Sequence, residues 1–475
     1  MRQGLFEVFS EGKLGRKADD LNEQAEALAG VGLQVPPGIA IATGAYDRLV
    51  ANFGLADGQT AADIQKRGCP DFLRYINRAI VDRLERGRPY AVRSSALAER
   101  GGTGVYRSVF FRATGNKRTD QRELWRCQCA VYAGELTAAA KAWRERVNMP
   151  PGMAVIIQKV EGFALGKYFL PALAGLAYTS YQGLPTVQAV VGLGTKAVNG
   201  EGLSLHTPSD HFLHFQRALW DQEEADAIGA RGNIEPINSH YSEIQGQLGH
   251  CYAAANRLFD QLAELKKRGD LYLEWAASGS EIAVVQCAPY ADRLAGSAPF
   301  DSDKYFLLLR SNDVKNVGRA SCNRIVFVGE WTRQTSERLR NLNAEMNGFL
   351  LIVPQQASSL LSHSYRLDFS HFSNARAVIE WQYHFRDDQR RNAIGRGLAD
   401  HSGGQGASHF SQLCQRADIL FIGAEFDMNP LFDLPGAREY QEYRELLVWD
   451  APCEVATDGG KNEGCVYVQK PTPSA

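Results

Sequence analysis

The chain alternates short apolar segments with longer helical patterns, and this alternation predicts an α/β fold. Apolar residues recur at helical spacing in residues 18–28, 124–143 and 242–267, and Ser242 is a suitable N-cap for the last of these helices. Short apolar runs bounded by Gly, Pro or polar residues predict strands. In the first part of the chain the predicted strands are 89–95, 153–158, 174–179, 188–191, 271–275 and 282–286. Residues 35–41 are predicted to be an extended edge segment that leads into a strand.

The chain is long enough to form more than one domain. A sequence of 475 residues exceeds what one ordinary hydrophobic core organises, so we expect two or three domains. Residues 291–303 are rich in Gly, Pro, Ser and Asp, a composition typical of a linker, and further strands are predicted at 324–328, 349–353, 419–423 and 465–469. The sequence therefore predicts a first α/β unit over 1–295, a linker over 296–310 and a smaller α/β unit over 311–475.

Charge and hydropathy limit the classes of partner. The formal net charge is −2, and no Lys/Arg-rich arm provides an electrostatic footprint for nucleic acid. The first residues lack the apolar core of a signal peptide, and no run of about 18 apolar residues would span a bilayer. We therefore expect a cytoplasmic protein with neither a nucleic-acid nor a membrane partner.

Nine cysteines are scattered through the chain, which is unlike the dense disulfide framework of a small secreted domain. We expect these cysteines to be reduced thiols. Cys127 and Cys129 form the only close pair. Because no second Cys or His pair follows at ligand spacing, two helical cysteines are a better interpretation than a zinc site.

Four polar residues of the first unit have the chemistry to bind a nucleotide with its metal ion. Lys17 lies at the start of a predicted helix and Arg93 at the end of a predicted strand, so both could donate to phosphate oxygens. Glu274 and Gln286 lie on the two strands of a predicted hairpin around Gly279 and could offer hard oxygen ligands to a metal. Taken singly, a surface lysine, a salt-bridged arginine and a paired glutamate are commoner explanations.

The second unit contains a Gly-rich loop that ends in a histidine. Gly403, Gly404 and Gly406 would let the backbone approach phosphate oxygens closely, and Ser408 adds a donor. A neutral imidazole nitrogen such as that of His409 is nucleophilic near pH 7. The loop predicts a phosphate-carrying histidine, and a buried, hydrogen-bonded loop histidine is the alternative.

Taken in order along the chain, these motifs resemble those of the phosphoenolpyruvate synthase and pyruvate phosphate dikinase family, which includes rifampin phosphotransferase. The most specific match is the Val-Arg-Ser-Ser-Ala-x-Ala-Glu loop at residues 92–99. The other matching segments are 15–21, 35–38, 43–46, 153–160, 174–179, 191–194, 273–275 and 285–286 in the first unit, and 317–321, 403–409, 419–423 and 462–468 in the second. The likeness therefore covers nearly the whole chain.

The resemblance implies a fold, a cofactor and a role for each candidate residue. It implies a two-lobed ATP-grasp domain that holds ATP and Mg²⁺, followed by a swivelling phosphohistidine domain. Within the first, Lys17 and Arg93 would grip phosphates, Gln158 would lie in the segment beside adenine, and Glu274 and Gln286 would hold the metal. In the second, His409 would carry the phosphoryl group, and Gly403, Gly404 and Ser408 would form its phosphate loop.

Three positions depart from the family pattern. Ala288 stands where the family has an arginine expected at the triphosphate, and Thr195 stands where it has a glutamate. The loop around His409 has one extra residue before the histidine and one fewer after it. These departures leave ATP binding as the expectation and make phosphoryl transfer the less certain step.

The sequence thus favours an ATP-dependent, dikinase-type phosphotransferase that passes phosphoryl through His409 to a small-molecule acceptor and releases AMP and phosphate. The family's pyruvate-binding barrel has no counterpart in these residues. An ATP-dependent ligase or condensing enzyme of a biosynthetic pathway is one alternative, and a non-catalytic nucleotide-binding protein is another. The identity of the acceptor, and whether a separate subunit carries it, stays open.

Overall fold

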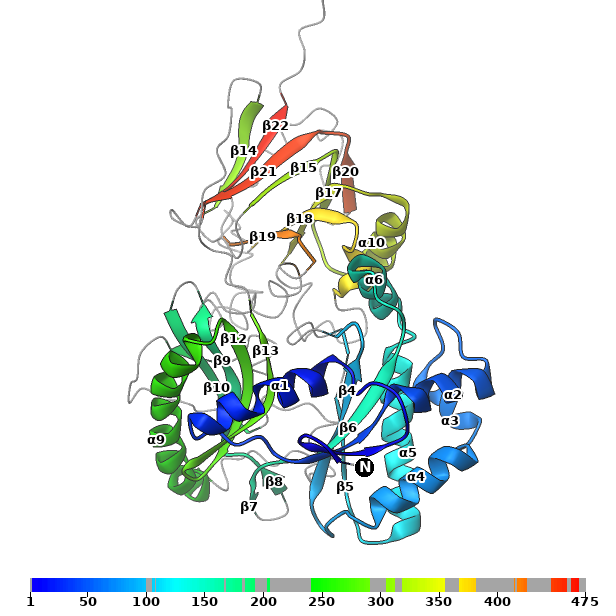
Figure 1. Cartoon of the computed structure of the whole chain (residues 1–475). Coiled ribbons are helices and arrows are strands. Elements are labelled where there is room, and N and C mark those ends of the chain that lie inside the picture. The colour runs from blue at the N-terminus through cyan, green and yellow to red at the C-terminus, as the bar shows by residue number, and fades with distance from the viewer. Residues whose placement is uncertain are drawn as a thin grey trace, which may run out of the picture. The chain divides into compact units, whose positions relative to one another are not determined.

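The computed structural model describes much of the chain as two compact units of mixed α/β structure, Met1–Ala291 and Asp292–Ala475. Over the described residues these units contain eight α-helices and several sheets (Figure 1). The described residues are 2–99, 105–106, 108–165, 168–181, 184–192, 203–205, 241–290, 305–311, 318–354, 367–381, 414, 417–424, 446–458 and 463–469.

A six-stranded sheet forms one part of the first unit. Its strand order is β1 (Arg2–Gln3), β2 (Phe6–Phe9), β3 (Gly38–Ile41), β6 (Met153–Lys159), β4 (Pro89–Ala96) and β5 (Val109–Arg112). The prediction that residues 35–41 lie at a sheet edge was wrong, because β3 pairs with β2 on one side and β6 on the other. The strand that pairs with this edge of β3 is β2, near the N-terminus. Its run of apolar residues is too short to predict a strand from the sequence.

Five helices accompany this sheet: α2 (Thr43–Phe53), α3 (Ala61–Lys66), α4 (Asp71–Val81), α5 (Lys117–Gly134) and α6 (Ala138–Val147). The single helix predicted over 124–143 is wrong, because the chain breaks between α5 and α6. Thr137 caps α6 by accepting a hydrogen bond from the backbone N–H of Ala140 at 3.1 Å. A threonine at an N-cap favours the start of a new helix over continuation of the preceding one. The alanine-rich pattern shows no sign of this break, so the pattern alone did not predict it.

A five-stranded antiparallel sheet forms the other part of the first unit. Its order is β11 (Leu203–Leu205), β10 (Leu184–Val191), β9 (Leu173–Tyr181), β12 (Leu271–Ser278) and β13 (Glu281–Pro289). The predicted hairpin is confirmed, and its turn contains Gly279 with φ of 73°. The helix α9 (Tyr241–Lys266) packs on β9, β10 and β12 (Figure 1). Because α9 already includes Tyr241, Ser242 lies inside the helix and is not its N-cap.

One hydrophobic core connects the two sheets of the first unit. The helix α1 (Arg16–Gly30) packs on β13 of one sheet and β4 of the other, with Leu21 and Leu28 fully buried. The same core contains Leu258 from α9 and Trp275 from β12. Since alternate residues of a strand face opposite sides, the neighbours of Trp275 point away from this core. That other face carries the polar side chains described below. A separate two-stranded ribbon pairs β7 (Phe163–Leu165) with β8 (Tyr168–Leu170).

The second unit contains two sheets that share a core. One is antiparallel, with the order β14 (Tyr305–Ser311), β22 (Glu463–Gln469), β21 (Cys453–Asp458) and β15 (Gly318–Cys322). The other has the order β19 (Leu420–Ala424), β18 (Ala375–Trp381), β17 (Phe349–Pro354), β16 (Arg324–Val328) and β20 (Leu446–Trp449), and it is parallel except for β20. Buried side chains from both sheets, such as Val466 and Ile352, form the core.

The second unit can be compared with the strands and the linker that the sequence predicts. The strands predicted at 324–328, 349–353, 419–423 and 465–469 correspond to β16, β17, β19 and β22, which confirms them. The assignment of 296–310 to a linker is wrong in its last part, because Tyr305–Ser311 forms β14 and pairs with β22. The apolar run at 306–309 belongs to a strand, and the polar residues before it obscured where the strand begins.

Candidate functional site

Arg93 lies at the centre of a polar cluster in the first unit. Its side chain is only 7% exposed, and its Nη2 donates to Glu274 Oε2 at 2.9 Å and to Gln286 Oε1 at 3.2 Å. Its Nη1 donates to Gln158 Oε1 at 3.3 Å and to the backbone oxygen of Val285. The structure therefore brings together four of the five residues predicted to bind ATP, and one guanidinium contacts the other three.

Strand register explains why these residues meet. Glu274 and Gln286 are direct partners across the β12–β13 pair, so their side chains leave the same face of the sheet. Gln158 pairs with Ala91 across β6 and β4, and Arg93 follows Ala91 by two residues, which places it on the same face. The amide of Gln158 also donates to the backbone oxygen of Pro36 at 2.9 Å. The four side chains thus come from four strands and two sheets.

An aromatic cluster adjoins Glu274. Tyr272 is fully buried, and its hydroxyl donates to Glu274 Oε1 at 2.8 Å. Tyr272 packs with Tyr178 and Tyr290 around Ala288, which is the cross-strand partner of Tyr272. The position that carries arginine in the family is therefore enclosed by aromatic rings here. Sequence reasoning missed Tyr272, although its spacing of two residues from Glu274 on a strand could have indicated it.

Lys17 lies outside the contacts that Arg93 makes. Its Nζ pairs with Glu99 Oε1 at 2.9 Å, and both side chains are 6% exposed. Glu99 also accepts hydrogen bonds from Ser94 Oγ at 3.2 Å and from the backbone N–H of Ala96 at 3.1 Å. Glu99 therefore holds Lys17 beside β4. Lys17 and Arg93 are thus paired with different carboxylates, Lys17 with Glu99 and Arg93 with Glu274. Its role as the partner of Lys17 was not predicted.

The start of α1 is attached to the same strand. Ser95 Oγ accepts a hydrogen bond from the backbone N–H of Ala18 at 3.1 Å, which satisfies one of the free N–H groups at the helix start. Gly15, at the N-cap, has φ of 78° and lies against the backbone of Ser95. The helix was predicted to begin just after Lys17, and it begins at Arg16, so Lys17 lies in its first turn.

A buried carboxyl group lies near this region. Glu135 is fully buried, and Gly152 N–H donates to its Oε1 at 3.0 Å, while Arg144 lies 3.4 Å from the same oxygen. Burial raises the pKa of Glu135 to about 7, against the lowering effects of Arg144 and Gly152, and the charge of Glu99 adds to the rise. Glu135 therefore titrates near neutral pH in the folded protein.

We expect the stability of the protein to depend on Glu135 through its raised pKa. Between pH about 4.5 and about 7 the unfolded chain releases the proton of Glu135 while the folded chain retains it, so stability falls as pH rises, by about 3 kcal/mol at most. Glu135→Gln should flatten this dependence. Urea denaturation at several pH values checks it, and an unchanged slope in the variant would contradict the assignment.

A buried Ser, His and Asp group occurs in the second unit. His371 Nε2 lies 2.9 Å from Ser336 Oγ, and His371 Nδ1 lies 3.0 Å from Asp368 Oδ1. Asp368 Oδ1 can only accept a hydrogen bond, and Arg340 Nη2, 3.3 Å from Nε2, can only donate one, so these two contacts favour the imidazole proton on Nδ1. Ser336 and His371 are 1% and 0% exposed. The group connects α10 (Arg333–Glu345) to the 3₁₀ helix η6 (Phe369–His371), and because both side chains are buried we interpret it as structural.

The predicted phosphate loop and its histidine lie outside the described residues. This holds for Gly403, Gly404, Ser408 and His409, and also for Thr195. Among the residues that are described, no group of three or more His, Cys, Asp or Glu side chains is placed to hold a metal ion.

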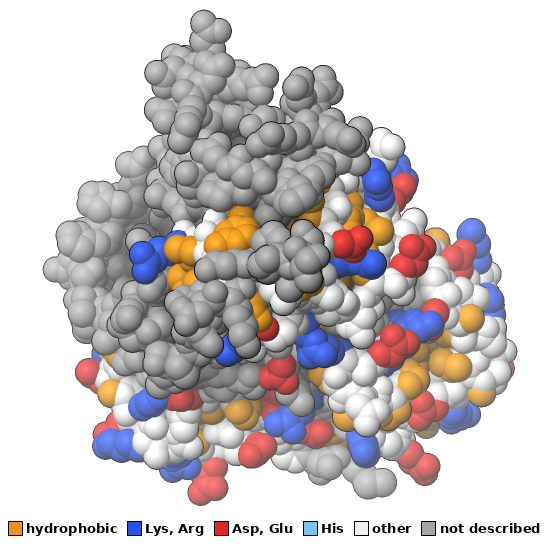
Figure 2. Space-filling model, turned by 90° about the horizontal axis from the view of Figure 1, so that it is seen from above, with side chains coloured by type: hydrophobic (Ala, Val, Ile, Leu, Met, Phe, Trp, Pro, Cys, Tyr) orange, Lys and Arg blue, Asp and Glu red, His pale blue; other side chains and the backbone are white. Residues whose placement is uncertain are grey.

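The described surface shows charges of both signs. On the face drawn in Figure 2, Lys and Arg side chains are interspersed with Asp and Glu over the described residues. No helix in the described part of the chain is long and apolar enough to cross a membrane.

Comparisons with protein-family models and with curated proteins found no relative of the chain. No protein-family model matches the chain, and no curated protein matches it significantly.

Proposed function

We propose that the first unit is an ATP-grasp domain that binds ATP with Mg²⁺ around Arg93. The observation that carries the proposal is the convergence of Gln158, Glu274 and Gln286 on the Arg93 guanidinium. Three of these residues were proposed as phosphate or metal ligands and the fourth as part of the adenine segment. They are separated by up to 193 positions in the chain, so their meeting within one hydrogen-bonded cluster supports a common role.

The oxygens of this cluster suit Mg²⁺. One Glu274 oxygen and the Gln286 amide oxygen lie 2.9 and 3.2 Å from the same Arg93 nitrogen, so they point to one place. Mg²⁺ prefers oxygen ligands and is commonly held by one or two protein side chains together with substrate phosphates. The ion would neutralise phosphate charge when bound. Tyr272, by donating to the other oxygen of Glu274, orients the carboxylate toward that place.

Arg93 and Lys17 would supply the positive charge that phosphates require. Both are buried and paired with carboxylates, Arg93 with Glu274 and Lys17 with Glu99. Binding of a polyphosphate would exchange these carboxylate partners for phosphate oxygens, which form bidentate or charge-assisted hydrogen bonds with the same groups. The cluster therefore has the charge balance expected of a phosphate-binding site without its ligand. Glu274 and Glu99 would neutralise Arg93 and Lys17 until phosphate binds.

We expect ATP with Mg²⁺ to raise the melting temperature of the protein. A ligand that binds only the folded state at 100 times its dissociation constant stabilises it by about 2.7 kcal/mol. Lys17→Ala and Arg93→Ala should each reduce the shift, because each removes a phosphate donor. Arg83→Ala is the matched control, since Arg83 belongs to the same unit but forms an exposed pair with Glu7. Wild-type melting that does not respond to millimolar ATP and Mg²⁺ would rule out the site.

We further propose a dikinase-type reaction in which a second, swivelling domain carries phosphoryl on His409. The imidazole would attack the β-phosphorus of ATP with AMP as the leaving group, and water would then cleave the terminal phosphate from the pyrophosphorylated histidine as inorganic phosphate. The remaining phosphohistidine would pass its phosphoryl group to a small-molecule acceptor. Positioning and electrostatic stabilisation supply most of the catalysis in such transfers. The sequence resemblance supports this step, and Gly403, Gly404 and Ser408 would surround the phosphate.

We expect ATP to label His409 with an acid-labile, base-stable phosphate. Mass spectrometry under alkaline conditions should find the modified peptide in the wild type and not in His409→Ala. His250→Ala, which changes an exposed histidine of α9, should retain the label and serves as the control. Turnover by His409→Ala at the wild-type rate would exclude a carrier role.

The enclosure of Ala288 by three tyrosines favours a second candidate, a nucleotide-binding protein without phosphoryl transfer. Chemistry that stabilises a transferring phosphoryl group needs cations near its oxygens, and this position cannot supply one. Assay of the products separates the candidates. AMP and phosphate indicate the dikinase reaction, a joined product without retained phosphate indicates a ligase, and unchanged ATP bound at the site indicates the non-catalytic protein.

A further inference from the structure

Two cysteines of the second unit lie opposite each other on neighbouring strands. Cys322 is the last residue of β15, and its cross-strand partner is Cys453, the first residue of β21. Directly opposed residues of antiparallel strands have Cα atoms about 4.5 or 5.5 Å apart. Disulfides span Cα separations of about 4.4–6.8 Å. The backbone register therefore already meets the main geometric requirement of a disulfide.

Neighbouring side chains fix this register. Glu454 Oε1 accepts a hydrogen bond from Ser321 Oγ at 2.6 Å, and Arg319 Nε donates to Glu454 Oε2 at 2.8 Å. Both contacts cross from β15 to β21 beside the cysteines. A slip by one residue would break both contacts and separate the two thiols, so the pair is held in place by more than backbone bonding.

The two cysteines influence each other in the reduced protein. Interaction with the Cys322 side chain, followed by burial, raises the pKa of the Cys453 thiol well above its ordinary value. The two residues are 4% and 2% exposed. Cys453 is therefore a weak nucleophile while its thiol stays protonated, and we assign the first attack to its partner Cys322.

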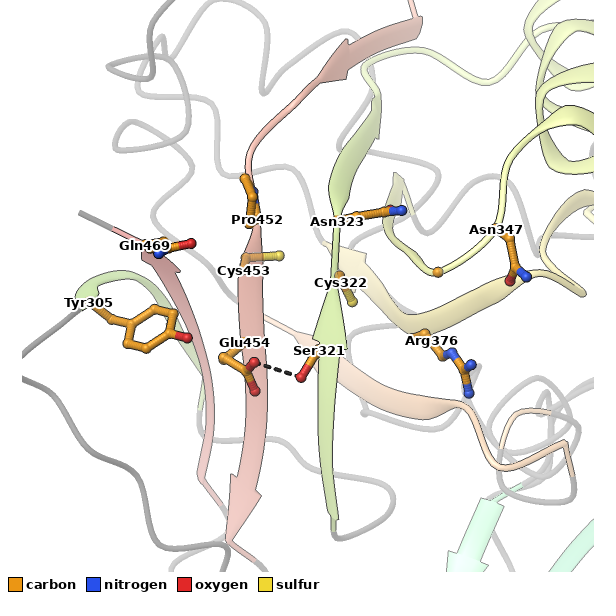
Figure 3. Close-up of a pocket in the computed structure, with 11 residues that line it drawn as sticks. Tyr305, Ser321, Cys322, Asn323, Asn347, Arg376, Pro452, Cys453, Glu454 and Gln469 are labelled. Atoms are coloured by element: carbon orange, nitrogen blue, oxygen red, sulfur yellow. Dashed lines mark hydrogen bonds between the residues drawn. The ribbon is translucent and has the colours of Figure 1, made fainter. Parts of the chain in front are cut away.

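A cavity of about 530 Å³ gives access to the pair (Figure 3). Cys322 and Cys453 are among its lining residues, and Figure 3 shows the side chain of Cys453 directed toward the strand that carries Cys322. The rest of the lining is largely polar and includes Asn323, Asn347 and Arg376. A small polar reactant can therefore enter the cavity and reach the thiols without unfolding of the second unit.

We propose that Cys322 and Cys453 are a reversible dithiol–disulfide site that reacts with a low-molecular-weight disulfide entering this cavity. In the first step the Cys322 thiolate attacks one sulfur of the small disulfide, forming a mixed disulfide and releasing one thiol. In the second step the Cys453 thiolate attacks the Cys322 sulfur, which forms the protein disulfide and releases the second thiol. The two protein thiols lose two protons and two electrons, and the small disulfide is reduced to two thiols.

The disulfide would fasten an edge strand. Among the described residues β15 is the last strand of its sheet and pairs there with β21, and Cys322 is its final residue before β16 begins at Arg324 in the other sheet. The link would close a loop of 453 − 322 = 131 residues, and cross-links over long loops restrict the unfolded chain strongly. We therefore expect the oxidised second unit to melt at a higher temperature than the reduced one.

Thiol counting with oxidised glutathione as the probe tests the proposal. The native full-length protein is incubated with oxidised glutathione at mildly alkaline pH, and is then denatured and alkylated. Reduced protein should accept nine labels, one for each cysteine, and oxidised protein 9 − 2 = 7. Peptide mapping should identify the cross-link as Cys322–Cys453. Treatment with a phosphine reductant should restore all nine labels and remove the rise in melting temperature.

Single variants separate this pair from the other cysteines. Cys322→Ser and Cys453→Ser should form no internal disulfide, whereas Cys465→Ser, a buried control on β22 of the same sheet, should still lose two labels on oxidation. The wild-type peptide map does not depend on how well the variants fold. Nine labels after prolonged exposure of the wild type, or a disulfide between any other two cysteines, would overturn the proposal.

Discussion

Arg93→Met is expected to lower the free energy of unfolding by about 3 kcal/mol and to abolish protection by ATP and Mg²⁺. The loss of stability follows because Glu274, with its side chain only 18% exposed, keeps its charge and loses its cation. The double variant Arg93→Met with Glu274→Gln removes both charges and should regain most of the stability. It should not regain the response to ATP, because the phosphate donor is still missing.

This comparison separates a structural ion pair from a binding site. Urea denaturation measures the coupling free energy of the two residues, and melting with and without ATP and Mg²⁺ measures binding. The matched control is the exposed pair of Arg83 and Glu7, whose closest atoms are 2.7 Å apart. Because exposed pairs contribute about 1 kcal/mol or less, Arg83→Met and Glu7→Gln should couple weakly and leave the ATP response intact. Full ATP protection of Arg93→Met would show that the Arg93 cluster is only structural.

Gly15→Ala is expected to destabilise the protein by about 3–5 kcal/mol. Gly15 has φ of 78°, which disfavours any residue with a Cβ, and an added Cβ would lie 1.7 Å from the backbone oxygen of Ser95. The clash must displace either the start of α1 or the strand β4. Either displacement moves Lys17 relative to Arg93, so the response to ATP should also be lost.

Gly30→Ala on the same helix provides the control with the opposite sign. Gly30 is the last residue of α1, and an added Cβ there would meet nothing within 4 Å. Alanine in a helix is favoured over glycine by about 0.5–1 kcal/mol, so this variant should be slightly more stable than the wild type. Thermal and urea denaturation of the two variants give the comparison. Wild-type stability of Gly15→Ala would contradict the close packing of α1 on β4.

Local patterns predicted those elements whose signal lies within a few consecutive residues. Residues 153–157 form an unbroken apolar run and 271–286 combine two largely apolar runs around Gly279, so β6 and the β12–β13 hairpin were foreseeable. The break between α5 and α6 was not, because α5 ends at Gly134 and Thr137 caps α6 within a continuous alanine-rich pattern. The short β2 and the start of β14 depend on pairing with distant strands, which a local pattern does not contain.

The residues of the candidate site also divide into those that the sequence could indicate and those that it could not. Arg93, Glu274 and Gln286 could be chosen from the sequence because their chemistry and their resemblance to known motifs distinguish them. The partner of Lys17 could not be chosen, because Glu99 meets Lys17 only through the packing of α1 near β4, which is set by the whole fold. Tyr272 lies two residues from Glu274 on one strand, so its contact could have been inferred from that spacing.

Three consecutive residues of β4 connect most of the features described above. Arg93 contacts the second sheet, Ser94 bonds the carboxylate that holds Lys17, and Ser95 bonds the first turn of α1. Both candidate phosphate donors are therefore connected to β4, Arg93 as one of its residues and Lys17 through Glu99 and the start of α1. If the proposed site binds a polyphosphate, this attachment would fix the spacing of the two donors beforehand, so that little conformational entropy would be lost on binding and phosphate chains of one length would be preferred.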